Sequence, residues 1–319
     1  MDYVFVLSGF VLLFLGGEGL VRGSVAIADR FGLSKLIIGL TIVGFGTSAP
    51  ELIVSAKAAL DGAPSIALGN VVGSNVANVL LIIGAAGLIY PISGWQRSAT
   101  RDGLIMTLAA LALFGFAHTD VIGRIEGAAL LCALLIYLLA SYWLEMRDKT
   151  PRVAEEETGE FETPWLANIW VAALAVIVSI AILMTGADLL VRGSVNIASA
   201  LGVSDAAIGL TVVAVGTSLP ELATAIVAAI RRHADVILGN VIGSNIFNVL
   251  GILGTTALIA PIPVAQRFTS VDTPFMLAVM AGLVLLLVLT RRIGRITSGL
   301  MLSGYVVYTI SLFAAGGAA

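Results

Sequence analysis

The chain alternates long apolar stretches with short polar connections, and ten of the apolar stretches are long enough to cross a membrane as helices. Their predicted limits are residues 3–28, 35–60, 65–90, 101–118, 121–146, 166–190, 204–230, 235–260, 272–290 and 296–316. The one long polar stretch, 147–164, separates two halves, 1–146 and 165–319, with five predicted helices each. The pattern therefore predicts an all-α polytopic membrane protein with ten transmembrane helices.

Two pieces of the first half return in the second half, 170 positions later and without gaps. Residues 39–51 and 209–221 are identical at nine of 13 positions, and residues 69–80 and 239–250 at nine of 12. Because each half holds an odd number of helices, two halves of the same fold must enter the membrane from opposite sides. The repeat therefore predicts two inverted five-helix repeats, an architecture common among secondary transporters.

Basic residues indicate how the chain is oriented. The side of the membrane that carries the loops after predicted helices one, three, five, seven and nine, together with the adjoining helix ends, collects 13 Lys and Arg residues, and the other side collects four. The positive-inside rule places the richer side in the cytoplasm, so both termini lie outside and the loop 147–164 is cytoplasmic. No basic leader precedes the first apolar run, so we expect the first helix to be retained. The five glutamates of the loop are interpreted as a solvated connector, with a regulatory cation site as the weaker alternative.

Composition supports a multi-pass protein in the lipid bilayer and excludes some kinds of binding site. Hydrophobic residues make up 59% of the chain and charged residues 12%, and the mean hydropathy is +1.05. The net charge of −3 gives no reason to expect nucleic acid as a partner. A single cysteine excludes an internal disulfide and a thiolate metal site. We expect no cofactor and no obligate protein partner.

Glu51 and Glu221 occupy equivalent positions and are the only acids well inside the predicted helices. A charge at the centre of a bilayer costs about 2.5–3.5 kcal/mol on insertion scales. The repeated pieces contain no Lys or Arg to neutralise these two carboxylates. Protonation or a bound cation is therefore required at this pair.

Backbone and side-chain oxygens surround the two glutamates. Pro50 has no N–H, so the carbonyl of Gly46 loses its helical partner and the helix should kink near Thr47, and Pro220 repeats the arrangement in the second half. Freed carbonyls survive in a membrane only if they are buried in protein or face water or an ion. Helical spacing further places polar side chains on shared faces, as in Asn70, Ser74 and Asn78, and in Asn240, Ser244 and Asn248.

This set of oxygens favours a hard cation. Ca²⁺ takes six to eight oxygen ligands, and Na⁺ accepts the same groups, whereas soft metals prefer sulfur or imidazole. One Ca²⁺ or two Na⁺ would neutralise the two glutamates, and a third Na⁺ could bind neutral oxygens. Competition for shared ligands would make the ions alternate, which is the hypothesis of antiport. For Asn70 and Asn240, hydrogen bonding between helices is as good an interpretation as ligation.

Gly-Thr-Ser-x-Pro-Glu followed by Gly-Asn-x-x-Gly-Ser-Asn-x-x-Asn, present twice, resembles the alpha repeats of sodium/calcium exchangers of the cation/Ca²⁺ antiporter superfamily, here of prokaryotic type. The alpha repeats correspond to residues 39–80 and 209–250, and the resemblance covers essentially the whole chain. It implies a prokaryotic inner-membrane location and a bundle of the first and sixth helices that slides to expose the core alternately to each side.

The resemblance also implies roles for individual residues. Ca²⁺ would be held at a central site by Glu51, Glu221 and the carbonyls of Thr47 and Thr217. Flanking Na⁺ sites would use the same glutamates with Ser48, Ser74, Ser218, Ser244 and the carbonyls of Gly44 and Ala214. Asn78 and Asn248 would line the middle. Position 248 is Asn where some prokaryotic members and the potassium-dependent branch carry Asp. This difference argues against K⁺ cotransport and leaves the charge of the middle site open.

The sequence thus predicts an electrogenic, K⁺-independent Na⁺/Ca²⁺ antiporter, with H⁺/Ca²⁺ exchange as the alternative. A cation channel is a further possibility within transport. A serine hydrolase built on Ser48 lacks a general base, because neither His nor Lys accompanies the serine in the core, so we predict no enzymatic activity.

Overall fold

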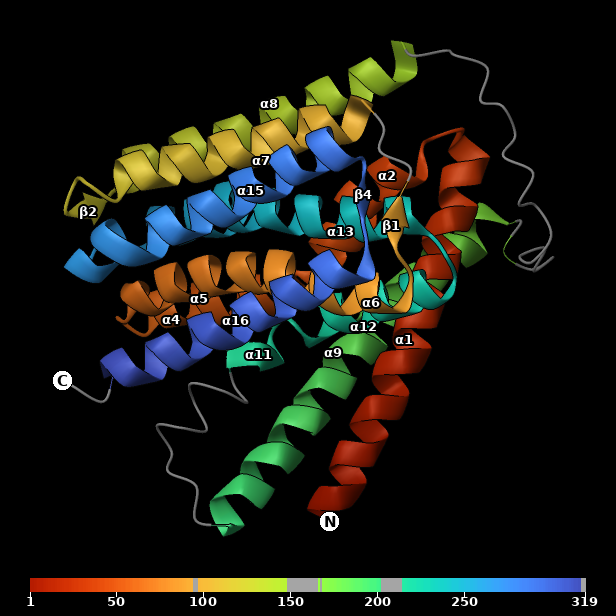
Figure 1. Ribbon diagram of the computed structural model, residues 1–319, viewed down its shortest axis with the longest axis horizontal. Coiled ribbons are helices and arrows are strands. Elements are labelled where there is room, and N and C mark those ends of the chain that lie inside the picture. Colours follow the sequence, from red (N-terminus) through yellow and green to blue (C-terminus); the bar gives the residue numbers. More distant parts are fainter. Residues whose placement is uncertain (94–96, 148–165, 167, 202–213, 317–319) are drawn as a thin grey trace.

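The computed structural model describes residues 1–93, 97–147, 166, 168–201 and 214–316, and it is helical apart from four two-residue strands (Figure 1). The elements of the first half are α1 (Asp2–Phe31), α2 (Lys35–Ile38), the π-helical segment η1 (Gly39–Val43), α3 (Gly44–Thr47), α4 (Ala49–Leu60), α5 (Pro64–Ala77), the π-helical segment η2 (Asn78–Ile82), α6 (Ile83–Ile89), β1 (Ile92–Ser93), α7 (Arg97–Phe116), β2 (Val121–Ile122) and α8 (Arg124–Arg147).

The described part of the second half has a similar order of elements, with an additional π-helical segment before α15. Its described elements are α9 (Ile169–Ala200), α11 (Ala214–Gly216), α12 (Leu219–Ile230), α13 (Ala234–Ile246), the π-helical segment η5 (Phe247–Leu253), α14 (Gly254–Ile259), β3 (Ile262–Pro263), the π-helical segment η6 (Phe268–Asp272), α15 (Thr273–Thr290), β4 (Arg292–Ile293) and α16 (Arg295–Gly316).

Several of these helices are long and apolar enough to cross a membrane. Within the described residues there are seven, or eight when the bent pair Lys35–Thr47 and Ala49–Leu60 is taken as one span. The predicted connecting loop 147–164 lies almost entirely outside the described residues, and so does the start of the predicted span 204–230. The prediction for the sixth span was too short, because α9 continues to Ala200 rather than ending at residue 190. Hydropathy falls in its last turns, but a helix can continue beyond the apolar part of its sequence.

The predicted kink near Thr47 is confirmed. The helix breaks at Ser48, and the segments on either side of it are bent by 44°. Pro50 lies in the first turn of α4, where its missing N–H has no helical partner to lose. The second half repeats the break at Ser218, and Pro220 lies in the first turn of α12. Two buried helix starts thus arise inside the bundle.

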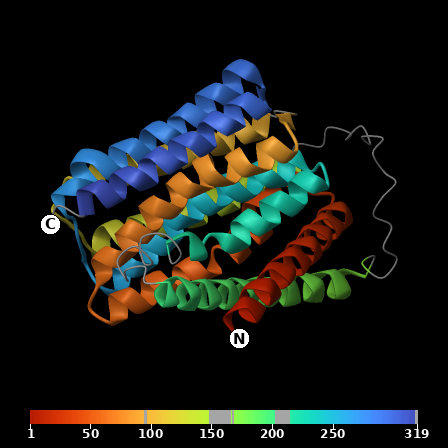
Figure 2. The same ribbon diagram turned by 60° about the horizontal axis from the view of Figure 1, so that its bottom comes forward.

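The long helices α1 and α9 pack against each other along one flank of the bundle (Figures 1 and 2). Glycines allow this close approach. A Cβ on Gly9 would lie 2.8 Å from the carbonyl oxygen of Gly186, and a Cβ on Gly186 would lie 2.9 Å from the backbone nitrogen of Leu13. Small residues at such contacts are a common means of helix association in membranes. The α1–α9 pair also contacts the core through α12.

Two small antiparallel sheets join the loops of one half to the loops of the other. Ile92 and Ser93 of β1 pair with Ile293 and Arg292 of β4, and Val121 and Ile122 of β2 pair with Pro263 and Ile262 of β3. These strands were not predicted from the sequence, because two residues are too few for an alternating pattern to show. The sheets mean that the two halves are interleaved at their loops.

Candidate ion-binding site

Glu51 and Glu221 meet in the interior. Each is 1% exposed, and each lies in the first turn of the helix that follows the break, α4 or α12. The N-terminus of a helix favours a negative charge, because its backbone N–H groups lack partners there. Ser48 Oγ donates to Glu221 Oε1 at 2.9 Å, and Ser218 Oγ donates to Glu51 Oε1 at 3.3 Å. Each carboxylate is therefore held by the serine of the opposite half.

The second oxygen of each carboxylate has no hydrogen-bond donor. Glu51 Oε2 and Glu221 Oε2 are buried and accept no hydrogen bond from any described residue. The two carboxyl groups are also close enough to interact electrostatically. A buried acceptor without a partner loses the full free energy of its hydration, and a charged one loses more. A cation between these oxygens would replace that lost hydration.

Asn78 and Asn248 add two more oxygens of the same kind. Both residues lie in π-helical segments, Asn78 at the start of η2 and Asn248 near the start of η5, and both are 1% exposed. Asn78 Nδ2 donates to Asn245 Oδ1 at 3.0 Å, and Asn248 Nδ2 donates to Asn75 Oδ1 at 3.2 Å. The Oδ1 atoms of Asn78 and Asn248 accept no hydrogen bond from a described residue. Four buried oxygens, two from each half, thus accept no hydrogen bond from the described residues, and the elements that carry them are in contact, α4 with η5 and α12 with η2.

Asn70 and Asn240 hold the glutamate helices in place. Their Nδ2 atoms donate to the backbone carbonyls of Glu51 and Glu221, each at 3.4 Å. Asn240 Oδ1 also accepts a hydrogen bond from Thr47 Oγ1 at 3.2 Å. This geometry favours hydrogen bonding between helices, one of the two interpretations that the sequence left open.

The other predicted Na⁺ ligands lie around the breaks. Ser244 Oγ of α13 donates to the Gly44 carbonyl at 3.1 Å, whereas Ser74 Oγ donates within its own helix, to the Asn70 carbonyl at 2.6 Å. Ala214 begins α11, and the buried Thr217 hydroxyl has no partner among the described residues. The Gly44 carbonyl is therefore already used by a serine, a competition that the sequence analysis did not anticipate.

Sequence reasoning missed Asn75 and Asn245 and the methionines behind them. Asn75 Nδ2 donates to Met276 Sδ at 3.6 Å, and Asn245 Nδ2 donates to Met106 Sδ at 3.5 Å. A signal was present, because residues 96–106 and 266–276 share the pattern Gln-Arg-x₄-Asp-x₃-Met at the same offset of 170 positions. The repeat therefore extends into the helices that flank the site.

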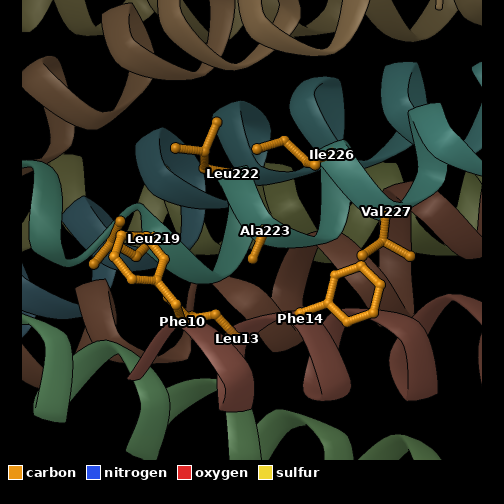
Figure 3. A pocket seen from close by; sticks show the side chains of 8 residues that line it. All are labelled: Phe10, Leu13, Phe14, Leu219, Leu222, Ala223, Ile226 and Val227. Carbon is orange, nitrogen blue, oxygen red and sulfur yellow. The ribbon is translucent and has the colours of Figure 1, made fainter. Parts of the chain in front are cut away.

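The site differs from the usual picture of a metal centre. The described residues contain no cluster of three or more His, Cys, Asp or Glu that could hold a metal, so a cation would depend on two carboxylates and neutral oxygens. A pocket of about 280 Å³ lies between α1 and α12 (Figure 3). Its lining is wholly apolar: Phe10, Leu13, Phe14, Leu219, Leu222, Ala223, Ile226 and Val227. It offers no side-chain oxygen and is not the ion site.

Comparison with known proteins gives matches along the whole chain. The family model for sodium/calcium exchanger proteins matches residues 1–143 and 171–314. A putative antiporter, CaxA of Alkalimonas amylolytica, is 38% identical over 97% of this chain and 98% of its own length. The sodium/calcium exchanger MaX1 of Methanosarcina acetivorans is 32% identical over 98% of this chain and 99% of its own.

A solved structure also matches. The sodium-calcium exchanger NCX_Mj, soaked with 2.5 mM Na⁺ and 0.1 mM Ca²⁺, is 32% identical, covers 98% of this chain and of its own chain, and superposes with a TM-score of 0.83.

Proposed function

Because this chain belongs to the sodium/calcium exchanger family, a family of cation/Ca²⁺ antiporters, we propose that it moves Ca²⁺ across the membrane in exchange for Na⁺ by alternating access. The observation that carries the proposal is the group of four buried acceptor oxygens on Glu51, Glu221, Asn78 and Asn248. A hard cation is the ligand that such oxygens prefer. The chain then acts as a transporter and not as an enzyme, and its ligands are the transported ions.

The ion sites form the next part of the proposal. Glu51 and Glu221, with the carbonyls of Thr47 and Thr217, hold Ca²⁺. Flanking Na⁺ ions use the same carboxylates, the four serines and the carbonyls of Gly44 and Ala214, and the two asparagines of the middle line the centre. The serine–carboxylate hydrogen bonds support this sharing, because the hydroxyls of Ser48 and Ser218 already lie within 3.3 Å of a glutamate oxygen. Ions that share ligands exclude one another, which couples their movement.

We further propose that residues 1–146 and 165–319 are inverted five-helix repeats, which gives ten transmembrane helices. Reciprocal hydrogen bonds support this proposal. The Ser48–Glu221 bond is the counterpart of the Ser218–Glu51 bond, and the Asn78–Asn245 bond is the counterpart of the Asn248–Asn75 bond. By the charge bias of the loops, both termini face outward, and the loop 147–164 faces the cytoplasm of a prokaryotic cell. The α1–α9 pair would slide against the core to expose the site alternately to each side.

The identity of the coupled ion is the most specific part of the proposal. Two Na⁺ neutralise the glutamates, and a third on neutral oxygens makes exchange electrogenic, whereas protons on the two carboxylates would make the protein an H⁺/Ca²⁺ exchanger. No Asp or Glu stands at position 248 to admit K⁺, so we expect exchange without K⁺.

Purified protein in proteoliposomes separates these possibilities. Na⁺, K⁺ and H⁺ gradients are imposed one at a time, and ⁴⁵Ca²⁺ uptake is measured. We expect an outward Na⁺ gradient to drive uptake. When three Na⁺ leave per Ca²⁺ entering, one net positive charge leaves the vesicle, so an interior-positive potential should speed uptake. K⁺ should have no effect beyond its effect on the potential. Uptake that follows the pH gradient and ignores Na⁺ would replace Na⁺ by H⁺ as the coupled ion.

A further inference from the structure

Two hydrogen-bonded chains of side chains end on the oxygens of the candidate site, and both begin at a methionine. One runs from Met106 Sδ to Asn245 to Asn78, and its counterpart runs from Met276 Sδ to Asn75 to Asn248. We propose that Met106 and Met276 are positioning residues, whose thioethers fix the amides of Asn78 and Asn248 so that carbonyl oxygens face the transported ions. The inference rests on the proposed function and adds to it the residues that orient the central ligands.

The shape of an asparagine side chain does not fix the positions of its oxygen and its nitrogen. Its oxygen and its NH₂ group are nearly equal in size, so only neighbouring hydrogen bonds decide which one points where. Asn75 and Asn245 face another amide on one side, and an amide can donate or accept. A pair of amides by themselves would be satisfied equally well with both side chains flipped.

The methionine removes this ambiguity because a thioether has no hydrogen to donate. Only the NH₂ group of Asn245 can be satisfied by Met106 Sδ, so the Oδ1 of Asn245 must point toward Asn78. Asn78 then has to present its NH₂ group to Asn245, which leaves its own Oδ1 on the other side. Met276 imposes the same direction on Asn75 and Asn248.

Burial of these residues makes a reversal of the hydrogen-bond direction costly. Asn75, Asn245, Met106 and Met276 are all 0% exposed, so bulk water is not at hand to satisfy a flipped amide. A flipped Asn245 would also leave its NH₂ group opposing that of Asn78, unless Asn78 flipped with it. That double flip would turn the NH₂ group of Asn78 toward the site, where its positive hydrogens repel a cation.

Leucine is the natural probe, because Met→Leu keeps the volume of a core side chain and removes the acceptor. Ca²⁺ binding is measured by isothermal titration calorimetry in detergent without Na⁺. We expect Met106→Leu and Met276→Leu each to weaken Ca²⁺ binding about two- to tenfold, as a net hydrogen bond of about 0.5–1.5 kcal/mol implies. The matched control is Met280→Leu, a buried methionine one turn along α15, which should bind as wild type does.

A double-mutant cycle tests whether the methionine acts through the amide. In an Asn78→Ala background, Met106→Leu should have no further effect on Ca²⁺ binding, whereas Met276→Leu should keep its full effect through Asn248. In EDTA, Met106→Leu and Met276→Leu should each unfold at a lower temperature than Met280→Leu, because each leaves a buried Asn NH₂ group without its acceptor. Equal weakening by Met106→Leu with and without Asn78 would show a packing effect and overturn the inference.

The failures of the two proposals look different. If the wild-type protein binds no Ca²⁺, or if Glu51→Gln binds as well as wild type, the proposed function fails. If the wild type binds, Glu51→Gln does not, and Met106→Leu is indistinguishable from Met280→Leu, only the role of the thioethers fails.

Discussion

Glu51→Gln separates an ion ligand from a structural buried acid. The amide oxygen of Gln can still accept the hydrogen bond that Ser218 Oγ donates to Glu51 Oε1, so the change removes a charge and little else. Two unit charges 4 Å apart attract by about 4 kcal/mol at an effective dielectric constant of 20, and the double charge of Ca²⁺ raises this to about 8 kcal/mol. At 1.4 kcal/mol per factor of ten, Ca²⁺ binding should weaken by about 10⁶-fold, and Na⁺ binding by about 10³-fold.

Without ions the same substitution should act in the opposite direction. Glu51 Oε2 is buried without a donor and lies near a second acid, so the charged pair opposes folding until a cation binds. A neutral Gln relieves that repulsion. We therefore expect the ion-free variant to be at least as stable as the wild-type protein, whereas loss of a structural charge pair would destabilise it.

Thermal unfolding in detergent, with EDTA or with Ca²⁺, measures both effects at once. Ligand at about 100 times its Kd stabilises a folded protein by about 2.7 kcal/mol, so wild type should show a clear shift of Tm on adding Ca²⁺. Glu51→Gln should show none. The control is Glu126→Gln at the start of α8. In the wild-type protein, Glu126 Oε2 accepts a hydrogen bond from the backbone N–H of Gly123 at 3.0 Å, and the variant should keep the Ca²⁺-dependent shift of Tm. A full Ca²⁺-dependent shift in Glu51→Gln would refute the assignment of the site.

Three further predictions test packing, pH dependence and the middle of the site. Gly243→Ala should lower the free energy of unfolding by about 1–3 kcal/mol, because a Cβ at this position meets the backbone of Leu40. Gly282→Ala, on the exposed side of α15, should instead stabilise the protein by up to about 1 kcal/mol. Equal Tm values of the two variants in detergent would contradict this prediction. Burial lowers the pKa of His233, between α12 and α13, to about 4, so the unfolded chain (pKa about 6.5) binds the proton first. The Tm of wild type relative to His233→Gln should therefore fall as the pH drops from about 6.5 to about 4 and be constant above 7, and parallel curves would argue against this. Asn248→Asp should tighten cation binding or admit a new coupled ion, seen as changed ion dependence of ⁴⁵Ca²⁺ flux; unchanged dependence would exclude position 248 as a ligand.

Much of the site could be predicted because the repeat lies within short sequence windows. Pro50 and Pro220 interrupt their own helices, and acids deep in apolar stretches mark Glu51 and Glu221, so both features are local. The contacts between the halves are not local. Asn78 finds Asn245, and Met106 finds Asn245 from the opposite side, only when the two halves are folded together. No periodicity within either half carries that information.

The end of α9 and the π-helical segments show a second limit of prediction from the sequence. Hydropathy predicted a sixth span ending at residue 190, whereas α9 ends at Ala200, because hydropathy reports where a chain leaves lipid and not where its helix stops. The π-helical segments at η2 and η5 were not predicted either. A π turn inserts one residue without any characteristic sequence, although such turns are often found at functional sites.

The two small sheets have a consequence for how the protein is made. β1 leaves the ribosome long before β4, and β2 long before β3. The first half therefore enters the membrane while two strand edges and several core amides still lack their hydrogen-bond partners. Contacts so distant in sequence close late and leave the growing chain open to wrong pairing. A truncated product that ends before Ile293 lacks the partner of Ile92, which gives cellular proteases an unpaired edge to recognise.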